Sequence, residues 1–123
     1  MKMKSSELTG AALDWAVLKA SNKAIGQPDH LPFNVEWLLM RDAGDFQYST
    51  NWAQGGPIIE REQLLIQPEI GKEGAGNAWS AISMQGFECL GPTPLVAAMR
   101  CYVASKLGDE VEIPAELTQG EAE

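Results

Sequence analysis

The chain has few positive charges, and they are not clustered. Nine Lys and Arg stand against seventeen Asp and Glu, which gives a formal net charge of −8. Proteins bind duplex nucleic acid largely by placing clustered Lys and Arg on its phosphates, so we expect no duplex nucleic acid as a partner. An acidic surface can instead imitate DNA and block a basic protein, or it can keep molecules apart through like charge.

Long apolar runs are missing as well. No stretch of the sequence approaches the roughly 20 apolar residues of a membrane span. The N-terminal Met1–Lys4 leads into polar sequence rather than into the apolar core of a signal peptide. We therefore expect a soluble cytoplasmic protein that has no membrane partner.

Side chains that carry catalysis or bind metals are scarce. His30 is the single histidine, and Cys89 and Cys101 have neither metal-site spacing nor the density of a disulfide scaffold. We expect both thiols to be reduced, and we expect no catalytic residue, no metal and no cofactor. A nuclease or hydrolase that uses His30, Glu60 and Glu62 is the weakest of the functional alternatives, because no nucleophile, base and orienting group occur together.

The length and composition predict one domain with two helices. The 123 residues, 45% of them apolar, are enough for a single core. Apolar spacing predicts a helix over about 7–23, capped by Ser6 or Thr9. Thr93, Pro94 and Gly108 are typical of the N-cap, first position and C-cap of a second helix. We expect residues 109–123 to form an acidic extended tail, held by Val111 and Ile113.

The middle of the chain contains short strand-like segments between breakers. Residues 24–33 read as a loop, and strands are predicted at 63–67 and 78–84. Residues 35–40 fit a strand or one turn of helix, and we favour the strand. The fold class expected for residues 1–123 is therefore α+β. In it, an N-terminal and a C-terminal helix pack on a small, mainly antiparallel sheet.

The stretch from Tyr48 to Glu62 is the first candidate for a binding site. It combines aromatic rings, short hydroxyls, a diglycine followed by proline, and a guanidinium. Gly-Gly-Pro favours a shaped turn, preceded by a brief helical turn that Ser49 or Thr50 caps. We expect this turn to direct Trp52 and Arg61 into one shared pocket, with Trp79 as a further aromatic surface. The candidate ligand-binding residues are Tyr48, Ser49, Thr50, Trp52, Gly55, Gly56, Arg61 and Trp79.

Three blocks of the sequence resemble the signature blocks of the phage NinX-type family, small proteins of tailed bacteriophages and prophages with no assigned activity. The blocks are Ser6–Val17, Tyr48–Glu62 and Gly91–Gly108, and together they span more than a third of the chain. A looser similarity links the Tyr-Ser-Thr block and the later Thr-Pro-Leu helix start to small phage α-β-α sandwich domains. The resemblance implies a phage accessory protein that acts in the host cytoplasm.

Two functional hypotheses follow from these residues. The first is a protein that binds a small anionic or aromatic ligand, such as a nucleotide-type signal of host defence, and sequesters it without catalysis. The second is an inhibitor that engages a host or phage protein through an acidic or Trp-bearing surface. A homodimer is favoured, because a small domain with four tryptophans has apolar surface to cover.

Overall fold

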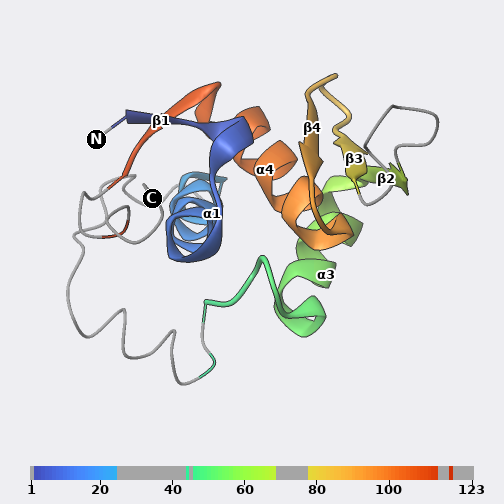
Figure 1. Ribbon diagram of the computed structural model, residues 1–123, viewed down its shortest axis with the longest axis horizontal. Coiled ribbons are helices and arrows are strands. Elements are labelled where there is room, and N and C mark those ends of the chain that lie inside the picture. The colour runs from blue at the N-terminus through green and yellow to red at the C-terminus, as the bar shows by residue number, and fades with distance from the viewer. Residues whose placement is uncertain (1, 25–43, 45, 69–77, 114–116, 118–123) are drawn as a thin grey trace.

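The computed structural model describes residues 2–24, 44, 46–68, 78–113 and 117. These residues do not include the strand predicted at 35–40 or His30. They include only Ala24 of the loop predicted at 24–33. Figure 1 shows the elements along the chain. In order they are β1 (Lys2–Lys4), the 3-10 turn η1 (Ser5–Glu7), α1 (Gly10–Ala24), α3 (Trp52–Glu62), β2 (Leu65–Pro68), β3 (Trp79–Ile82), β4 (Glu88–Gly91), α4 (Pro94–Leu107) and β5 (Glu110–Glu112).

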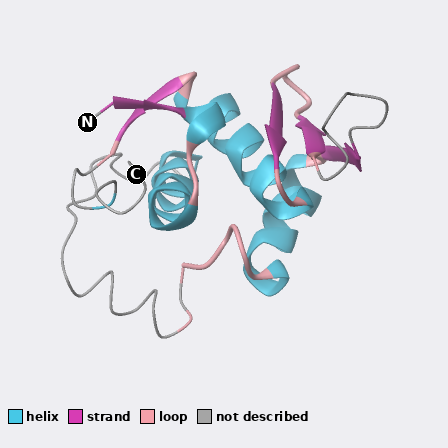
Figure 2. Cartoon of the chain, viewed as in Figure 1, coloured by secondary structure: helices cyan, strands magenta, loops and turns pink. Residues whose placement is uncertain are grey.

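Two small antiparallel sheets are present, and they confirm the expected α+β class. β2, β3 and β4 form a three-stranded sheet in which Ile66 pairs with Ala81 and Ala81 with Cys89. β1 and β5 form the second sheet, in which Met3 pairs with Val111. The two ends of the described chain therefore lie side by side (Figure 2).

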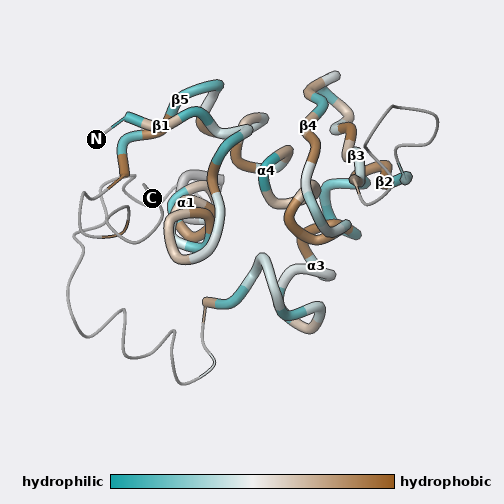
Figure 3. Tube along the Cα trace, in the orientation of Figure 1, coloured by the Kyte–Doolittle hydropathy of each residue, from teal (hydrophilic) through white to brown (hydrophobic). Residues whose placement is uncertain are grey.

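α4 lies at the centre of the fold and agrees closely with the predicted second helix. The Thr93 hydroxyl accepts a hydrogen bond from the backbone N–H of Val96, and Pro94 occupies the first turn. Gly108 ends the helix at φ +94°, a backbone angle that favours glycine. The helix is buried almost all round, since it contacts α1, α3 and the three-stranded sheet. Figure 3 shows hydrophobic segments in α4, α1 and β4.

The first helix is shorter at its N-terminal end than predicted. α1 begins at Gly10, and the preceding residues form η1 and β1 instead. The Ser5 hydroxyl donates to the carbonyl of Gly108, which fixes η1 against the end of α4. α1 buries Leu13, Ala16 and Val17, and its contacts are chiefly with α4.

The segment predicted to be a shaped turn is a helix, which is the main correction. Gly55, Gly56 and Pro57 all lie inside the eleven-residue α3. The N-cap is Asn51, neither Ser49 nor Thr50, and its side chain accepts a hydrogen bond from the Ala53 N–H at 2.9 Å. Pro57 cannot donate a backbone hydrogen bond within the helix, so packing against the core outweighs the local preference of Gly-Gly-Pro for a turn.

The remaining strands differ from the predictions mainly at their ends. β2 begins at Leu65, because Gln63 takes a left-handed conformation that ends α3. β3 covers the middle of the strand predicted at 78–84, and the Ser83 N–H then donates to the Phe87 carbonyl across the hairpin to β4. In the segment predicted to be a tail, Val111 and Ile113 are buried and Val111 belongs to β5.

Candidate ligand-binding site

A cavity of about 230 Å³ lies where the N-terminal ends of α3 and α4 meet. One side comes from the residues that lead into α3, and the other comes from the N-cap and first turn of α4. Both helix ends are fixed by capping side chains, so the walls are held by regular secondary structure. The lining residues are Ser49, Thr50, Trp52, Thr93, Leu95 and Val96.

Ser49, one of the lining residues, has a buried hydroxyl. Ser49 is only 2% exposed, and its Oγ has no hydrogen-bond partner in the described part of the chain. The backbone N–H of Ser49 is bonded, since it donates to Oδ1 of Asp14 in α1 at 2.9 Å. A buried hydroxyl without a partner is unfavourable, and native proteins satisfy nearly all such groups. Ser49 lines the cavity, but its Oγ has almost no accessible surface, so this hydroxyl does not open into the cavity.

Backbone N–H groups at both helix ends add donors to the same region. In α4, Val96 donates to the Thr93 side chain and Ala97 to the Thr93 carbonyl, while Leu95 N–H has no partner among the described residues. In α3, the Trp52 N–H likewise has none within the described ranges. The positive ends of two helix dipoles meet in this region, although most of the surface that lines the cavity is apolar.

Trp52 supplies a flat surface at the edge of the cavity. It is the first residue of α3 and is 55% exposed, although tryptophan is largely buried in most proteins. An exposed indole can stack on a planar group while its edge stays in contact with water. Ser49, Thr50 and Trp52 are thus three predicted site residues that the structure brings together.

Gly55 acts on the cavity by allowing close packing. A Cβ at Gly55 would meet the Tyr48 carbonyl oxygen and would lie 2.6 Å from Cδ1 of Leu95. Glycine therefore lets α3 approach the first turn of α4, which forms the opposite wall. Gly56 has open space at the Cβ position, and neither Gly56 nor the partly buried Tyr48 lines the cavity.

Arg61 does not share a pocket with Trp52, so that prediction is wrong. The two residues are nine positions apart in α3, which places them on opposite faces of the helix and roughly 13 Å apart along its axis. Arg61 Nη2 donates to the Tyr102 hydroxyl at 3.0 Å, and that hydroxyl lies 3.2 Å from Ser21 Oγ. Arg61 thus connects α3 to α4 and, through Tyr102, to α1. Trp79 lies in β3 and is not part of the cavity wall.

Glu62 continues this link between the helices. Burial alone would raise the pKa of Glu62, but hydrogen bonds from Arg61 and Lys106 outweigh it and hold the pKa below its usual value. The Lys106 Nζ lies 3.1 Å from Glu62 Oε1, and Arg61 Nε lies 3.1 Å from Oε2. The charged end of α3 therefore stabilises the fold at a distance from the cavity.

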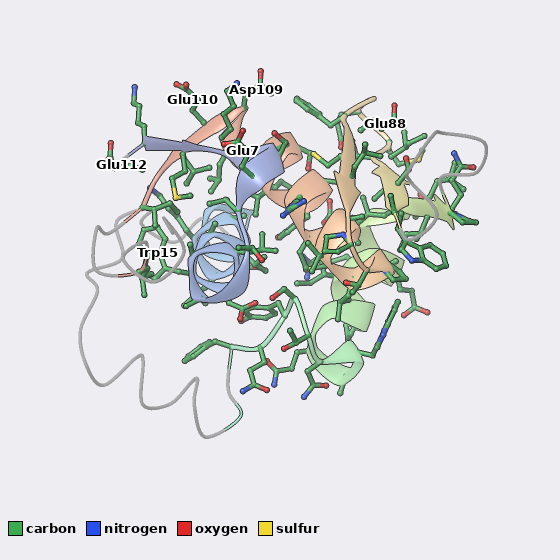
Figure 4. The ribbon with its side chains drawn as sticks, in the orientation of Figure 1. Glu7, Trp15, Glu88, Asp109, Glu110 and Glu112 are labelled. Carbon is green, nitrogen blue, oxygen red and sulfur yellow. The ribbon has the colours of Figure 1, made fainter. Side chains whose placement is uncertain are left out.

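A second cavity, of about 740 Å³, lies on another side of α4. Figure 4 shows Glu7, Asp109, Glu110 and Glu112 beside the β1–β5 sheet, and Glu88 on β4, all well away from α3. The cavity is lined by Lys4, Ser5, Ser6, Phe87, Glu88, Cys89, Ala104, Asp109 and Glu110.

The two cysteines lie near this acidic side and are buried. Burial raises the pKa of Cys89, and burial raises the pKa of Cys101 to about 11. Both thiols are free, in agreement with the prediction that they are reduced. Their raised pKa values make them poor nucleophiles in the folded protein.

Sequence reasoning missed the half of the site that α4 contributes. Thr93 is read from the sequence only as a helix cap, and neither Leu95 nor Val96 is among the predicted site residues. The signal that could have found them is the N-cap itself, since a helix N-terminus is a place where anions bind. Within the described residues, no three His, Cys, Asp or Glu side chains gather closely enough to hold a metal ion.

Comparison with known proteins identifies the family. The family model described as bacteriophage P22 NinX matches residues 4–106, which is most of the chain and extends from β1 to the end of α4. No curated protein matches the chain. In the part of the chain that the structure describes, no helix is both long enough and apolar enough to cross a bilayer. The chain belongs to the bacteriophage P22 NinX family.

Proposed function

We propose that this phage protein binds a small anionic or aromatic ligand, such as a nucleotide-type molecule, in the cavity between α3 and α4. The observation that carries the proposal is the Trp52 indole, which is 55% exposed and lines a cavity where two helix N-termini meet. A planar ligand could stack on this indole while the rest of it occupies the cavity.

The cavity wall supports binding rather than chemistry. Its six residues carry hydroxyl, indole and aliphatic groups, and none of them has a side chain that commonly acts as a general base. Ser49 and Thr93 could serve as nucleophiles only with such a base beside them. We therefore propose that the protein sequesters its ligand without changing it.

The phage family gives this activity a biological setting. A phage protein that sequesters a small molecule can act against a host that uses such molecules as defence signals, and sequestration needs no catalytic group. Trp52 would stack on the planar part of the ligand, a contact worth about 1–3 kcal/mol for a nucleic-acid base.

Small molecules retained by the purified protein would test this proposal. Protein from phage-infected cells is denatured, and the released molecules are identified by mass spectrometry. We expect a planar or negatively charged compound from the wild type and from Leu65→Ala, since Leu65 is exposed on β2 and does not line the cavity. Trp52→Ala should release much less. Equal amounts from the two variants would contradict the proposal.

A second candidate function is inhibition of a host or phage protein through the acidic side of the molecule. The observation that favours it is the larger cavity, whose lining includes Glu88, Asp109 and Glu110. A basic partner would be attracted to these carboxylates, and salt would weaken its binding. A protein that co-purifies with the wild type but not with a Glu88→Lys, Asp109→Lys double variant would favour this function over ligand sequestration.

A further inference from the structure

We propose that the larger cavity is a groove that binds an extended, positively charged segment of a partner protein, which pairs with the free edge of β4 as an added strand. This inference rests on the second candidate function, inhibition of a host or phage protein, and adds to it the chemistry of the partner segment. It is independent of the α3–α4 cavity.

β4 is an edge strand with backbone groups that point outward. The sheet order is β2-β3-β4, so within the described chain β4 is paired with a strand on one side only. The Ser83 N–H donates to the Phe87 carbonyl, and from there along the hairpin hydrogen-bonded and non-hydrogen-bonded residue pairs alternate. Cys89 therefore exchanges hydrogen bonds with β3, whereas the backbone groups of Glu88 and Leu90 point away from β3.

These outward groups are accessible for pairing. Glu88 is exposed, and Leu90 is 47% exposed. The Leu90 carbonyl accepts a hydrogen bond from Arg100 Nη1 at 2.8 Å. The Leu90 N–H and both backbone groups of Glu88 have no partner among the described residues. Unpaired edge groups of this kind are a template for another extended chain.

The free edge of β4 forms one wall of a groove. The opposite wall comes from η1 and the start of β5, and α4 lies between the two walls (Figure 1). Arg100 of α4 links the walls at one end, because its Nε donates to the Leu8 carbonyl at 2.7 Å while its Nη1 donates to Leu90. The volume of about 740 Å³ lies within the roughly 300–1,000 Å³ that is usual for binding sites.

The groove favours a positively charged occupant. Its lining contains the carboxylates of Glu88, Asp109 and Glu110 but only one amine, that of Lys4. Figure 4 shows Asp109 and Glu110 beside β5 and Glu88 on β4, so the carboxylates belong to both walls. An added strand that carries Lys or Arg opposite Glu88 would gain a cross-strand pair of opposite charge.

The other face of an added strand would be apolar. Side chains alternate along β4, so Cys89 lies on the same face as Gly91, which packs against the backbone of Ala97 in α4. Phe87 and Ala104 add apolar surface to the groove. The partner segment should therefore alternate basic and apolar side chains. A second copy of this chain fits less well, because two chains with a net charge of −8 repel each other.

Two blocked peptides of opposite charge test this inference. They are acetyl-Lys-Val-Lys-Val-Lys-amide and acetyl-Glu-Val-Glu-Val-Glu-amide, and five extended residues span roughly 16 Å, enough to cover the four residues of β4. Binding to the full chain is followed by NMR at low ionic strength, together with the rate of amide hydrogen exchange along β4. The Cys89 amide is the internal control, because it is already bonded to β3.

We expect the lysine peptide to bind about tenfold more tightly than the glutamate peptide, with an affinity that falls as salt is added. Its binding should slow hydrogen exchange severalfold at Glu88 and Leu90 and should leave Cys89 little changed. Asp109→Lys should weaken binding of the lysine peptide, whereas Leu65→Ala, in β2 and away from the groove, should not.

Four results would overturn the inference. Binding of the lysine peptide without slower exchange at Glu88 and Leu90 would show charge attraction without strand pairing, and it would leave the second candidate function in place. Equal affinity for both peptides would show that the groove does not select charge. Exchange at these amides that slows with protein concentration alone would identify a second copy of the chain as the occupant. If neither peptide binds at millimolar concentration, the inference fails, and the co-purification experiment decides separately whether the second candidate function fails with it.

Discussion

Replacing Ser49 with alanine should make the protein more stable. Ser49 Oγ is buried and has no hydrogen-bond partner in the described chain, so the folded protein bears the cost of removing it from water. Alanine removes that hydroxyl and keeps the Cβ and the backbone N–H that donates to Asp14. The substitution therefore deletes an unfavourable group without breaking an observed contact.

The size of the effect follows from the cost of an unsatisfied hydroxyl. Mutational data place that cost at about 1–3 kcal/mol, and loss of the oxygen leaves a small void that offsets part of the gain. We expect the free energy of unfolding to rise by about 1 kcal/mol. For a domain of this length that corresponds to an increase of about 3–5 °C in Tm.

Thermal and urea unfolding of the purified, ligand-free protein measure this effect. Thr50→Ala is the matched control, because Thr50 lines the same cavity but is exposed, and its Tm should change little. An unchanged or lower Tm for Ser49→Ala would show that the hydroxyl has a partner in the free protein. That result would refute the conclusion that Ser49 Oγ is buried without a hydrogen-bond partner.

Four other substitutions distinguish the residues of α3 that shape the cavity from those that do not. Gly55→Ala should destabilise the protein by about 1–3 kcal/mol in urea unfolding, because its Cβ would meet Leu95 and the neighbouring backbone. Gly56→Ala, where the Cβ would lie in open space, should stabilise the helix by about 0.5–1 kcal/mol. Equal effects of the two variants would contradict the observed packing. Arg61→Ala should lower stability by about 1 kcal/mol but leave the affinity for a planar ligand such as benzoate unchanged, since Arg61 bonds to Tyr102 away from the cavity. Glu62→Gln should lower stability by about 1 kcal/mol at pH 7. Because the folded pKa of Glu62 lies below its ordinary value of 4.5, this difference should disappear as the pH falls below 4.5, and a difference that persists in acid would argue against the ion pairs.

Elements with strong local signals were predictable from the sequence. α4 has a threonine cap, a proline in its first turn, an apolar stripe and a terminal glycine, and each of these acts within a few residues of its own position. β1 has no such signal. It forms because Met3 pairs with Val111, more than a hundred residues later, and no local pattern encodes that pairing.

α3 shows where local reasoning gives the wrong answer. Gly55, Gly56 and Pro57 normally interrupt helices, so the sequence predicts a turn there. In the structure the absence of a side chain at Gly55 lets α3 pack closely on Leu95, and that packing holds the helix together. The glycine is needed for close approach and does not take a positive φ.

Only half of the candidate site was predictable, because the other half depends on packing between helices. Ser49, Thr50 and Trp52 are neighbours in sequence, and their unusual mixture of hydroxyls and an indole indicates a binding surface. Thr93 and Leu95 join them only because α3 packs against the first turn of α4. The sequence-based prediction placed Arg61 on the wrong surface. It assumed a turn that would bring Arg61 beside Trp52, whereas in the observed helix the two residues lie on opposite faces.

Chemical-shift mapping with benzoate tests the central claim most directly. Backbone amide signals of the full chain are assigned and followed as benzoate is added. The account predicts that the amides of Leu95 and Ser49 and the indole of Trp52 shift together with one dissociation constant, while those of Glu88 and Asp109 beside the larger cavity do not. Shifts confined to the larger cavity, or none near the N-terminal ends of α3 and α4, would contradict it.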